Sequence, residues 1–436
     1  MNILLIGQCS LHWGRMEFGN IGNYYIIEPF IRQLHQTFPG ANIKTTFQLS
    51  DGFCVRENIS VLPMELYYGW NESDLDCALK ELSIAELYKS MGKVVSTTSY
   101  IDEVLSADLV IDFSGDIWGD NADFLGPNRF LVGLIKDRVA QLLGKPTVML
   151  AGSPGPFDNQ DTLEFAKEVF ADFDLVTNRE PISMEILKEY GFDISKTFSK
   201  ACPSFLFEPQ KEFSFISILD KEGIEDNGRP KAGFILCGWN FTEGPFDKWP
   251  REDKDYLKFA ESVEYMIDVL GLDVYLMSHS NGFPIPPKEF ELQHGRDYPI
   301  IKQLQKVLSK RGVQDHVHSI DGVYDTWETK ALIGNFDFLV SGRVHGAIAG
   351  LSQAIPTVII DYGHEPKAHK LVGFAKVIDV ENYVASPESS DSLKKIIKDC
   401  WIHRKVVQKN IANRLNLVHQ MTLENFQLTR EVFEGH

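Results

Sequence analysis

The sequence predicts an α/β protein built from two doubly wound, Rossmann-like domains that face a cleft, followed by a helical C-terminal segment. Short apolar runs typical of buried strands alternate with helix-like segments through most of the chain, and this alternation places parallel strands in one sheet. One polar stretch interrupts the pattern, which then restarts. With 436 residues, the chain is also longer than one ordinary domain, so we expect two.

The first half of the chain begins with an apolar strand at residues 2–6 and a helix at 23–37, which Pro39 and Gly40 end. Further strands are expected at 43–48, 108–113, 147–151 and 175–178. Further helices are expected at 129–143 and 183–190, the second capped by Ser183 and closed by Gly191. These elements make up the expected N-terminal domain, residues 1–210.

The second half begins after a polar, Gly- and Pro-containing stretch, and we interpret residues 211–231 as a linker. The expected C-terminal domain spans residues 232–388. Its strands are expected at 232–238, 273–278, 338–340 and 357–360, and its helices at 254–270, 300–311 and from 346 onward. Residues 389–436 are charged and helical in pattern, and they could cross back to the N-terminal domain.

Composition and charge narrow the function classes. The net charge of −18 argues against a nucleic-acid binder and against docking on anionic lipid by overall electrostatics. An anionic substrate therefore needs a local cluster of cations. The six cysteines form no C-x-x-C pair, which is typical of a reduced, cytoplasmic protein. No apolar stretch approaches the roughly 20 residues of a membrane span, so we expect no integral membrane segment.

The most informative segment is the strand at 338–340 and the turn that follows it. The strand ends at Ser341 and Gly342, and Arg343 and His345 come directly after, at the start of a helix whose first turns carry small side chains. Ligands of open α/β sheets bind beyond the carboxyl ends of the strands, and a helix N-terminus favours anions there. Arg343 adds a planar, permanently charged fork for carboxylate or phosphate. We interpret the small residues as room for a ligand.

The order Ser341, Arg343, His345, then Pro356, with a tyrosine and a lysine further on at Tyr362 and Lys367, resembles the polysaccharide pyruvyl transferase family. Three other segments resemble elements of that family: the Gly-Asn segment at 19–23, the Gly-Ser-Pro-Gly-Pro-Phe segment at 152–157, and the Asn-Arg-Glu segment at 178–180. Two departures are present: Asn23 stands where the family has Asp, and the turn at 114–116 is less glycine-rich. The resemblance implies the GT-B architecture.

The resemblance also implies a transferase that moves the pyruvyl group of phosphoenolpyruvate onto two hydroxyls of a glycan or glycolipid sugar as a ketal. His345 is the expected general acid, because a neighbouring phosphate favours the imidazolium. Asp116 could accept a proton from a sugar hydroxyl or simply form a turn. The residues expected to bind phosphoenolpyruvate are Arg343, Val344, Arg179, Lys367 and His279. Those expected at the acceptor sugar are Asn20, Asn23 and Asp120.

We expect no metal and no cofactor, because no His, Cys, Asp and Glu spacing matches a known metal site and phosphoenolpyruvate serves as the donor. The expected partners are phosphoenolpyruvate and a saccharide or lipid-linked glycan acceptor, with no nucleic acid; the chain could form a homo-oligomer. It could also lie peripherally at a membrane through a lipid-linked acceptor.

Two other functions fit the same pattern. One is a GT-B glycosyltransferase that uses a nucleotide sugar, with Arg343 and Lys367 on the diphosphate. The other is a non-catalytic carbohydrate-binding protein. The order of the Arg-x-His turn, the tyrosine and the lysine favours pyruvyl transfer. The chain also lacks the Gly-x-Gly-x-x-Gly, P-loop and Gly-x-Ser-x-Gly motifs of dehydrogenases, kinases and hydrolases.

Overall fold

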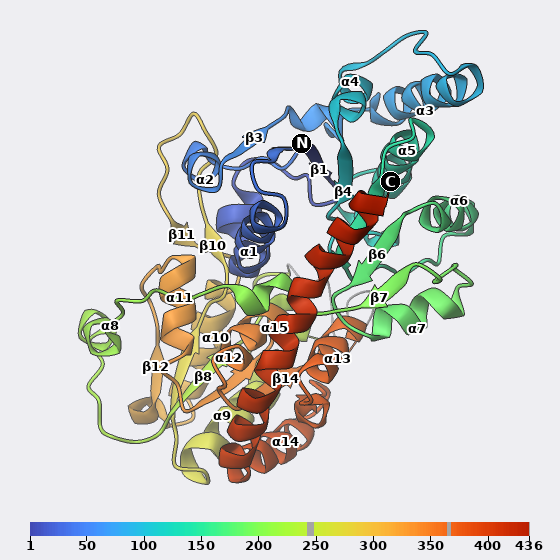
Figure 1. Ribbon diagram of the computed structural model, residues 1–436. Coiled ribbons are helices and arrows are strands. Elements are labelled where there is room, and N and C mark those ends of the chain that lie inside the picture. The colour runs from blue at the N-terminus through green and yellow to red at the C-terminus, as the bar shows by residue number, and fades with distance from the viewer. Residues whose placement is uncertain (242–247, 364–367, 436) are drawn as a thin grey trace. The chain divides into compact units, whose positions relative to one another are not determined.

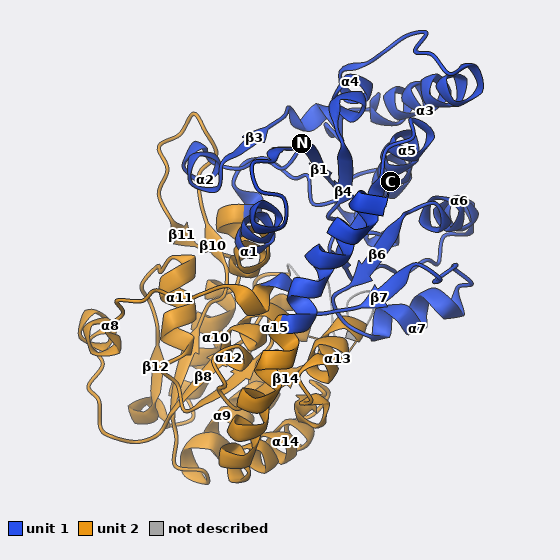
Figure 2. Cartoon of the chain, in the orientation of Figure 1, with its two compact units in different colours: residues 1–16, 28–203, 420–436 blue, residues 17–27, 204–419 orange. Residues whose placement is uncertain are grey.

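The computed structural model describes residues 1–241, 248–363 and 368–435. The chain forms two compact units, shown in different colours in Figure 2. Unit 1 comprises residues 1–16, 28–203 and 420–436, and unit 2 comprises residues 17–27 and 204–419. Each domain expected from the sequence is one continuous segment of the chain. The observed units are not continuous, since residues 17–27 lie within the N-terminal part of the chain but belong to unit 2.

Unit 1 is built on a seven-stranded sheet in which every pair of neighbours is parallel. Its strand order is β3-β2-β1-β4-β5-β6-β7. The strands are β1 Asn2–Ile6, β2 Asn42–Thr45, β3 Ile59–Val61, β4 Leu109–Asp112, β5 Thr147–Gly152, β6 Leu175–Asn178 and β7 Thr197–Ser199. The order reverses between β1 and β4, which is the point where ligands of doubly wound sheets bind.

Helices cover this sheet (Figure 1). They are the later part of α1 Ile21–Thr37, together with α2 Asp51–Glu57, α3 Asp74–Met91, α4 Ser99–Ser106, α5 Arg129–Leu142, α6 Gln160–Ala171 and α7 Ile182–Glu189. One core cluster joins α3, α4 and α5 to β1 and β4. A second surrounds the fully buried Trp118, whose ring contacts Phe130, Phe157 and Phe170. Trp118 and Phe157 lie in the segments after β4 and β5, so burial of these large apolar side chains stabilises the positions of those two segments.

Unit 2 contains a six-stranded parallel sheet of order β12-β9-β8-β13-β14-β15. Its strands are β8 Lys231–Ile235, β9 Asp273–Met277, β12 Val317–Ser319, β13 Phe338–Ser341, β14 Thr357–Ile360 and β15 Val384–Ala385. A short antiparallel ribbon pairs β10 Asn281–Gly282 with β11 Gln293–His294. The strand order reverses between β8 and β13, so the carboxyl ends of these two strands form the switch point of this sheet.

The helices of unit 2 are α8 Phe215–Glu222, α9 Leu257–Asp268, α10 Tyr298–Ser309, α11 Thr326–Ile333, α12 Val344–Leu351, α13 Ala368–Val377 and α14 Ser390–Ile402. The last helix, α15 Arg404–Gly435, begins in unit 2, and its residues from 420 onward belong to unit 1. There Asn425 donates to the carbonyl of Ala201 at 3.0 Å, and Glu424 pairs with Lys200 at 2.6 Å. The helical C-terminal segment is therefore confirmed.

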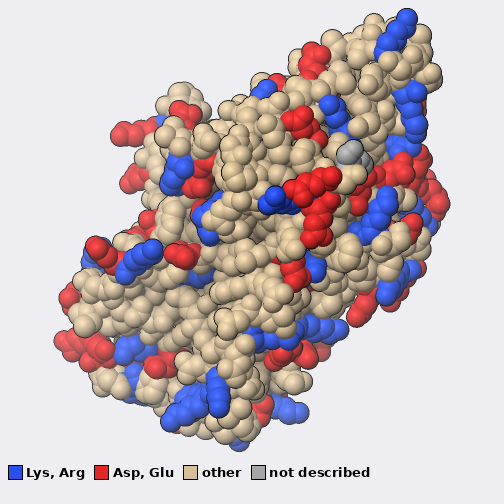
Figure 3. All heavy atoms as spheres, viewed as in Figure 1, with Lys and Arg blue, Asp and Glu red and all other residues tan. Residues whose placement is uncertain are grey.

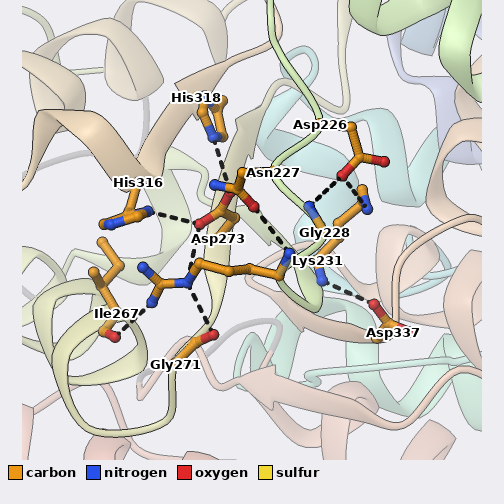
Figure 4. Close-up of polar contacts among 11 residues, drawn as sticks. Asp226, Asn227, Gly228, Lys231, Ile267, Gly271, Asp273, His316, His318 and Asp337 are labelled. Carbon is orange, nitrogen blue, oxygen red and sulfur yellow. Dashed lines mark hydrogen bonds and ion pairs between the residues drawn. The ribbon is translucent and has the colours of Figure 1, made fainter.

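A polar cluster anchors the amino edge of the unit 2 sheet (Figure 4). Asp273, the first residue of β9, has a side chain only 2% exposed. It accepts a hydrogen bond from Asn227 at 2.6 Å and lies 2.9 Å from Nδ1 of His316 and 3.3 Å from Nε of Arg229. His318 contacts its second oxygen at 3.4 Å. This carboxylate ties β9 to β12 and to the segment before β8, at the edge opposite the carboxyl ends.

The expected fold class is confirmed in both units: each is an α/β domain with a parallel sheet. The segment expected as a linker, residues 211–231, contains α8. Ser214 caps this helix by accepting a hydrogen bond from the amide of Ser217 at 3.2 Å, and Ile218 and Leu219 are buried. The sequence does not predict α8, because a helix of eight residues with two buried apolar positions is too short to show a helical period of apolar residues.

Candidate functional site

The turn from β13 to α12 holds the first group of candidate residues. The Ser341 hydroxyl accepts a hydrogen bond from the amide of Arg343 at 3.2 Å and donates one to its carbonyl at 2.8 Å. Arg343 is the N-cap residue of α12. A Cβ at Gly342 would lie 2.0 Å from Oδ1 of Asn240, so only glycine fits there. The sequence correctly places Arg343 and His345 between a buried strand and a helix N-terminus.

Asn240 holds three strand ends together. Its amide nitrogen donates to the carbonyls of Gly342 at 3.2 Å and Ile360 at 3.3 Å, and its oxygen accepts from the amide of Cys237 at 2.9 Å. The side chain is fully buried. Cys237, Gly342 and Ile360 lie at the carboxyl ends of β8, β13 and β14. Asn240 is not among the residues expected from the sequence, because nothing in its local sequence distinguishes it from a turn asparagine.

Arg343 is held by a buried carboxylate, Asp297, which directly precedes α10. The pair is bidentate: Nε lies 2.9 Å from Oδ2 and Nη2 lies 2.5 Å from Oδ1. The two side chains are 7% and 0% exposed. Burial alone would lower the pKa of Arg343, but the Asp297 carboxylate raises it above its ordinary value. The sequence predicts Arg343 as a cation for the ligand, but it does not predict this partner 46 residues away.

His279, which follows β9, is buried beside this pair. It is 0% exposed, and neither ring nitrogen has a hydrogen-bond partner among the described residues. The Tyr25 ring lies 5.5 Å away. Burial, and secondarily the charge of Arg343, lower the pKa of His279 to about 3. The imidazole is therefore neutral at physiological pH, with one donor and one acceptor that no described residue satisfies.

His345, the second residue of α12, packs against the Gly-Asn segment near the start of the chain. A Cβ at Gly22 would lie 2.5 Å from Cβ of His345 and 2.8 Å from its Nδ1, so this close approach requires glycine. The Phe374 ring lies 5.9 Å away. His345 is 8% exposed. The segment that resembles the family's Gly-Asn element thus forms one wall around the expected general acid.

The two asparagines expected at the acceptor sugar lie in that same segment, in unit 2. Asn20 pairs with Ser280 in an isolated antiparallel bridge, and its side chain accepts a hydrogen bond from the amide of Gly22 at 3.2 Å. The amide of Asn23 donates to the carbonyl of Asn20 at 2.8 Å. Both side chains are half-buried. The fold brings Asn20 and Asn23 to the cluster of His279, Arg343 and His345.

The small residues of α12 do not serve the purpose we expected from the sequence. A Cβ at Gly346 would lie 2.8 Å from the Ser341 hydroxyl, and one at Gly350 would lie 2.7 Å from a methyl of Leu339. These glycines let α12 pack closely on β13. The interpretation that they leave room for a ligand is wrong for both positions.

A second group of candidates lies in unit 1, beyond the carboxyl ends of β4, β5 and β6. Arg179, 2% exposed, donates to the Ser153 hydroxyl at 2.9 Å and pairs with Asp116 at 3.5 Å. Asp116 is 22% exposed. Gly115 has a φ of 63°, and a Cβ there would lie 3.8 Å from Arg179. The structure therefore brings Asp116 and Arg179 together, with Ser153 of the Gly-Ser-Pro-Gly-Pro-Phe segment as a partner that the sequence analysis missed.

Two other side chains of unit 1 have local hydrogen-bond partners. Asp120 accepts hydrogen bonds from the amides of Asp158, at 2.5 Å, and Asn159, at 2.8 Å, so its carboxylate closes a loop. Ser183 is not the cap of α7. Instead, the Glu180 carboxylate accepts hydrogen bonds from the amides of Ile182, at 2.7 Å, and Ser183, at 3.2 Å, and from the Ser183 hydroxyl.

Of the other expected site residues, Val344 begins α12 and is 6% exposed, and Lys367 lies outside the described residues. Within the described ranges, no three His, Cys, Asp or Glu side chains are arranged to hold a metal ion. In the same ranges, no helix combines the length and the apolar character that crossing a bilayer requires.

Two parallel-sheet α/β domains, each with polar side chains at its switch point, define a protein of the GT-B-like class. The chain belongs to the polysaccharide pyruvyl transferase family, whose family model matches residues 20–364. It is 23% identical over 383 residues to the amylovoran biosynthesis protein AmsJ of Erwinia amylovora, a match that covers 84% of each chain.

Solved structures show the same fold at low identity. A glycosyltransferase from Rickettsia africae matches with a TM-score of 0.60 and 11% identity, over 100% of this chain and 99% of that chain. Anabaena HepE in complex with UDP matches with a TM-score of 0.60 and 12% identity, over 100% of both chains. A putative UDP-N-acetylglucosamine 2-epimerase from Listeria monocytogenes matches with a TM-score of 0.54 and 11% identity, over 94% of this chain and 90% of that chain.

Proposed function

We propose that this protein transfers the pyruvyl group of phosphoenolpyruvate to two hydroxyls of one sugar in a glycan or glycolipid and forms a cyclic ketal. Membership of the polysaccharide pyruvyl transferase family supports the class of reaction. The observation that carries the donor assignment is the group of Arg343, His345 and His279 around the N-terminus of α12. There, an oriented guanidinium and the N-terminus of a helix favour an anion.

The proposed chemistry begins with the donor. Arg343 and the first amides of α12 bind the charged oxygens of phosphoenolpyruvate. His345 donates a proton to the methylene carbon, which becomes a methyl group, and the neighbouring carbon takes on oxocarbenium character. A sugar hydroxyl attacks that carbon and loses its proton. Phosphate then leaves and restores the oxocarbenium character of that carbon. The second hydroxyl attacks it and its proton passes to His345, so one ketal and one phosphate form from each donor. Neutral His279, an expected ligand residue that is fully buried beside Arg343 and Asp297, adds no charge to the site.

Unit 1 supplies the remaining groups of the proposal. Asp116 is the candidate base for the attacking hydroxyl, because it is a partly exposed carboxylate at the carboxyl edge of its sheet. Arg179 pairs with Asp116 at 3.5 Å and so holds the carboxylate in place. No metal and no cofactor enter the proposed reaction.

The test is a transfer assay with phosphoenolpyruvate and a panel of saccharides that contain galactose, glucose, mannose or their N-acetyl derivatives. Release of phosphate, together with a new methyl singlet of a ketal in the NMR spectrum of the sugar, is the expected result. Isothermal titration of phosphoenolpyruvate in excess EDTA should give the same affinity as without EDTA. Binding of UDP-glucose with no response to phosphoenolpyruvate would contradict the proposal and favour a glycosyltransferase.

A further inference from the structure

Helix α3 of unit 1 is apolar on two opposite sides. Its inner side packs against α5 through Ala78, Ile84 and Ala85, which are at most 5% exposed. On the same side, Glu81 pairs with Lys136 of α5 at 2.5 Å, with both side chains nearly buried. Packing and a buried ion pair therefore fix which side of α3 faces the protein.

The outer side carries Leu79, Leu87 and Met91, which are 44%, 48% and 50% exposed. Their spacing of eight and four residues places them along one stripe of the helix. Directly after α3, Val94 and Val95 are 45% and 52% exposed. These five residues, called the α3 patch below, are a quarter of the twenty large apolar side chains that are exposed in the described part of the chain. Such a concentration indicates an interaction surface rather than scattered surface residues.

The charges around the α3 patch identify the partner. Lys89 and Lys93 are exposed beside its C-terminal part, where Glu86 is the exposed acid between residues 83 and 97. Lys80 lies nearer the start of the helix, where Glu72 and Asp76 are also exposed. Figure 3 shows basic side chains over α3 and the connection after it. Protein interfaces are depleted in lysine, whereas lysine beside apolar groups is typical of helices on a lipid surface, where the stem lies among acyl chains and the ammonium reaches the headgroups.

We propose that the α3 patch docks this protein on a bilayer surface that contains anionic phospholipid. The net charge of −18 does not prevent this docking, because charges more than about 8–10 Å from the membrane are largely screened at physiological salt. The connection from α3 to α4 lies at an outer end of unit 1, so it can reach a flat surface (Figure 1). The apolar residues supply insertion, and the lysines supply the preference for anionic headgroups.

Flotation with vesicles tests this proposal. The full chain should float with vesicles of phosphatidylcholine mixed with phosphatidylglycerol, less with phosphatidylcholine alone, and less as salt rises. The triple substitution Leu87→Ser, Met91→Ser and Val95→Ser should lower the partition coefficient by at least about tenfold. The double substitution Lys89→Glu and Lys93→Glu should remove the anionic preference, at roughly fivefold or more per lysine.

The matched control is Ile216→Ser, which removes an apolar side chain that is 68% exposed on α8 and should leave flotation unchanged. Thermal unfolding of each variant shows whether it is folded. Failure of the folded wild-type chain to bind the mixed vesicles would overturn the proposal, as would equal binding by the folded triple variant. A concentration-dependent dimer that the triple substitution abolishes, without vesicle binding, would show instead that the patch is an interface between copies. None of these outcomes depends on pyruvyl transfer.

Discussion

The pairing of Arg343 with Asp297 determines what Arg343 can do for a ligand. An arginine whose charge is matched by a buried carboxylate contributes less to the net field than an unpaired one. In exchange, the bidentate contact fixes the plane of the guanidinium before a ligand arrives, so less conformational entropy is lost on binding. In the proposed site, Arg343 therefore contributes a guanidinium of fixed orientation to ligand binding as well as its positive charge.

The substitution Arg343→Lys should weaken phosphoenolpyruvate binding by roughly ten- to a hundredfold, because a charge-assisted hydrogen bond contributes about 1.5–3 kcal/mol. Lysine keeps the charge but cannot make the two-pronged contact with Asp297. Isothermal titration measures the change. The control is Arg229→Lys at the amino edge of the same sheet, which should not alter the affinity. An unchanged dissociation constant for Arg343→Lys would exclude a direct contact.

His279 makes the stability of the protein depend on pH. The folded state holds its pKa at about 3, whereas the unfolded chain has the ordinary value of 6.5. Below pH 6.5 the unfolded state therefore binds more protons, and the contribution of His279 to stability, full above pH 6.5, is lost as the pH falls toward 3. At pH 5 the loss should be roughly 2 kcal/mol.

Urea unfolding of the wild type and of His279→Gln at pH 8 and pH 5 checks this expectation. Glutamine does not titrate. The difference in free energy of unfolding between the two proteins should therefore shift by roughly 2 kcal/mol in favour of the variant between pH 8 and pH 5. If the difference is the same at both pH values, His279 is already protonated or hydrated in the folded state.

At the scale of elements, the contact between the start of α1 and α12 is set by one glycine. The substitution Gly22→Ala would force its Cβ onto His345, and such overpacking costs about 1–3 kcal/mol. We expect a lower melting temperature and a lower rate of transfer, since the ring of His345 must move. The control is Gly52→Ala in α2, where the nearest atom is 3.8 Å away and the change should be neutral or stabilising. Wild-type activity in Gly22→Ala would show that the position of His345 is not critical.

The sequence predicts the strands that are continuous runs of buried apolar residues. Strands β4, β5, β6, β9, β13 and β14 were all expected, because a strand covered on both faces reads as continuous apolar residues. Helix α3 was missed, since apolar residues on two sides blur the helical period. Short edge strands such as β7 and β15 carry too few residues to give a pattern. The expected start of α9 at 254 was early, because residues 253–256 form a 3₁₀ turn before Leu257.

In the candidate site, too, the features with a local sequence pattern could be predicted and the contacts between distant residues could not. The local features around Arg343 and His345 could be read from the chain, because a strand, a turn and a helix start adjoin in sequence. The partners could not: Asp297 lies 46 residues from Arg343, and Asn240 lies 102 residues from Gly342. Such contacts depend on strand order, which a single sequence does not specify. Only the folded sheet shows that β8, β9 and β13 end side by side.

At the scale of the whole molecule, the candidate groups divide between the two units. The cluster around Arg343 and His345 belongs to unit 2, and Asp116 and Arg179 belong to unit 1. If the proposed function is correct, donor binding and activation of the acceptor are separable. A substitution in unit 1 should then change transfer without changing the affinity for phosphoenolpyruvate alone.

Asp116→Asn provides that test. Asparagine keeps the size of the side chain but cannot take a proton from a sugar hydroxyl, so turnover should fall by about 10²–10⁴ while titration of phosphoenolpyruvate gives the wild-type affinity. The matched control is Asp120→Asn, four residues away. That carboxylate accepts two backbone hydrogen bonds, so its loss should lower the melting temperature more than the turnover of the folded fraction. Full turnover in Asp116→Asn would exclude Asp116 as the base. A loss of donor affinity in the same variant would show that the two roles are not separate, because Asp116 or its partner Arg179 would then contribute to the donor site.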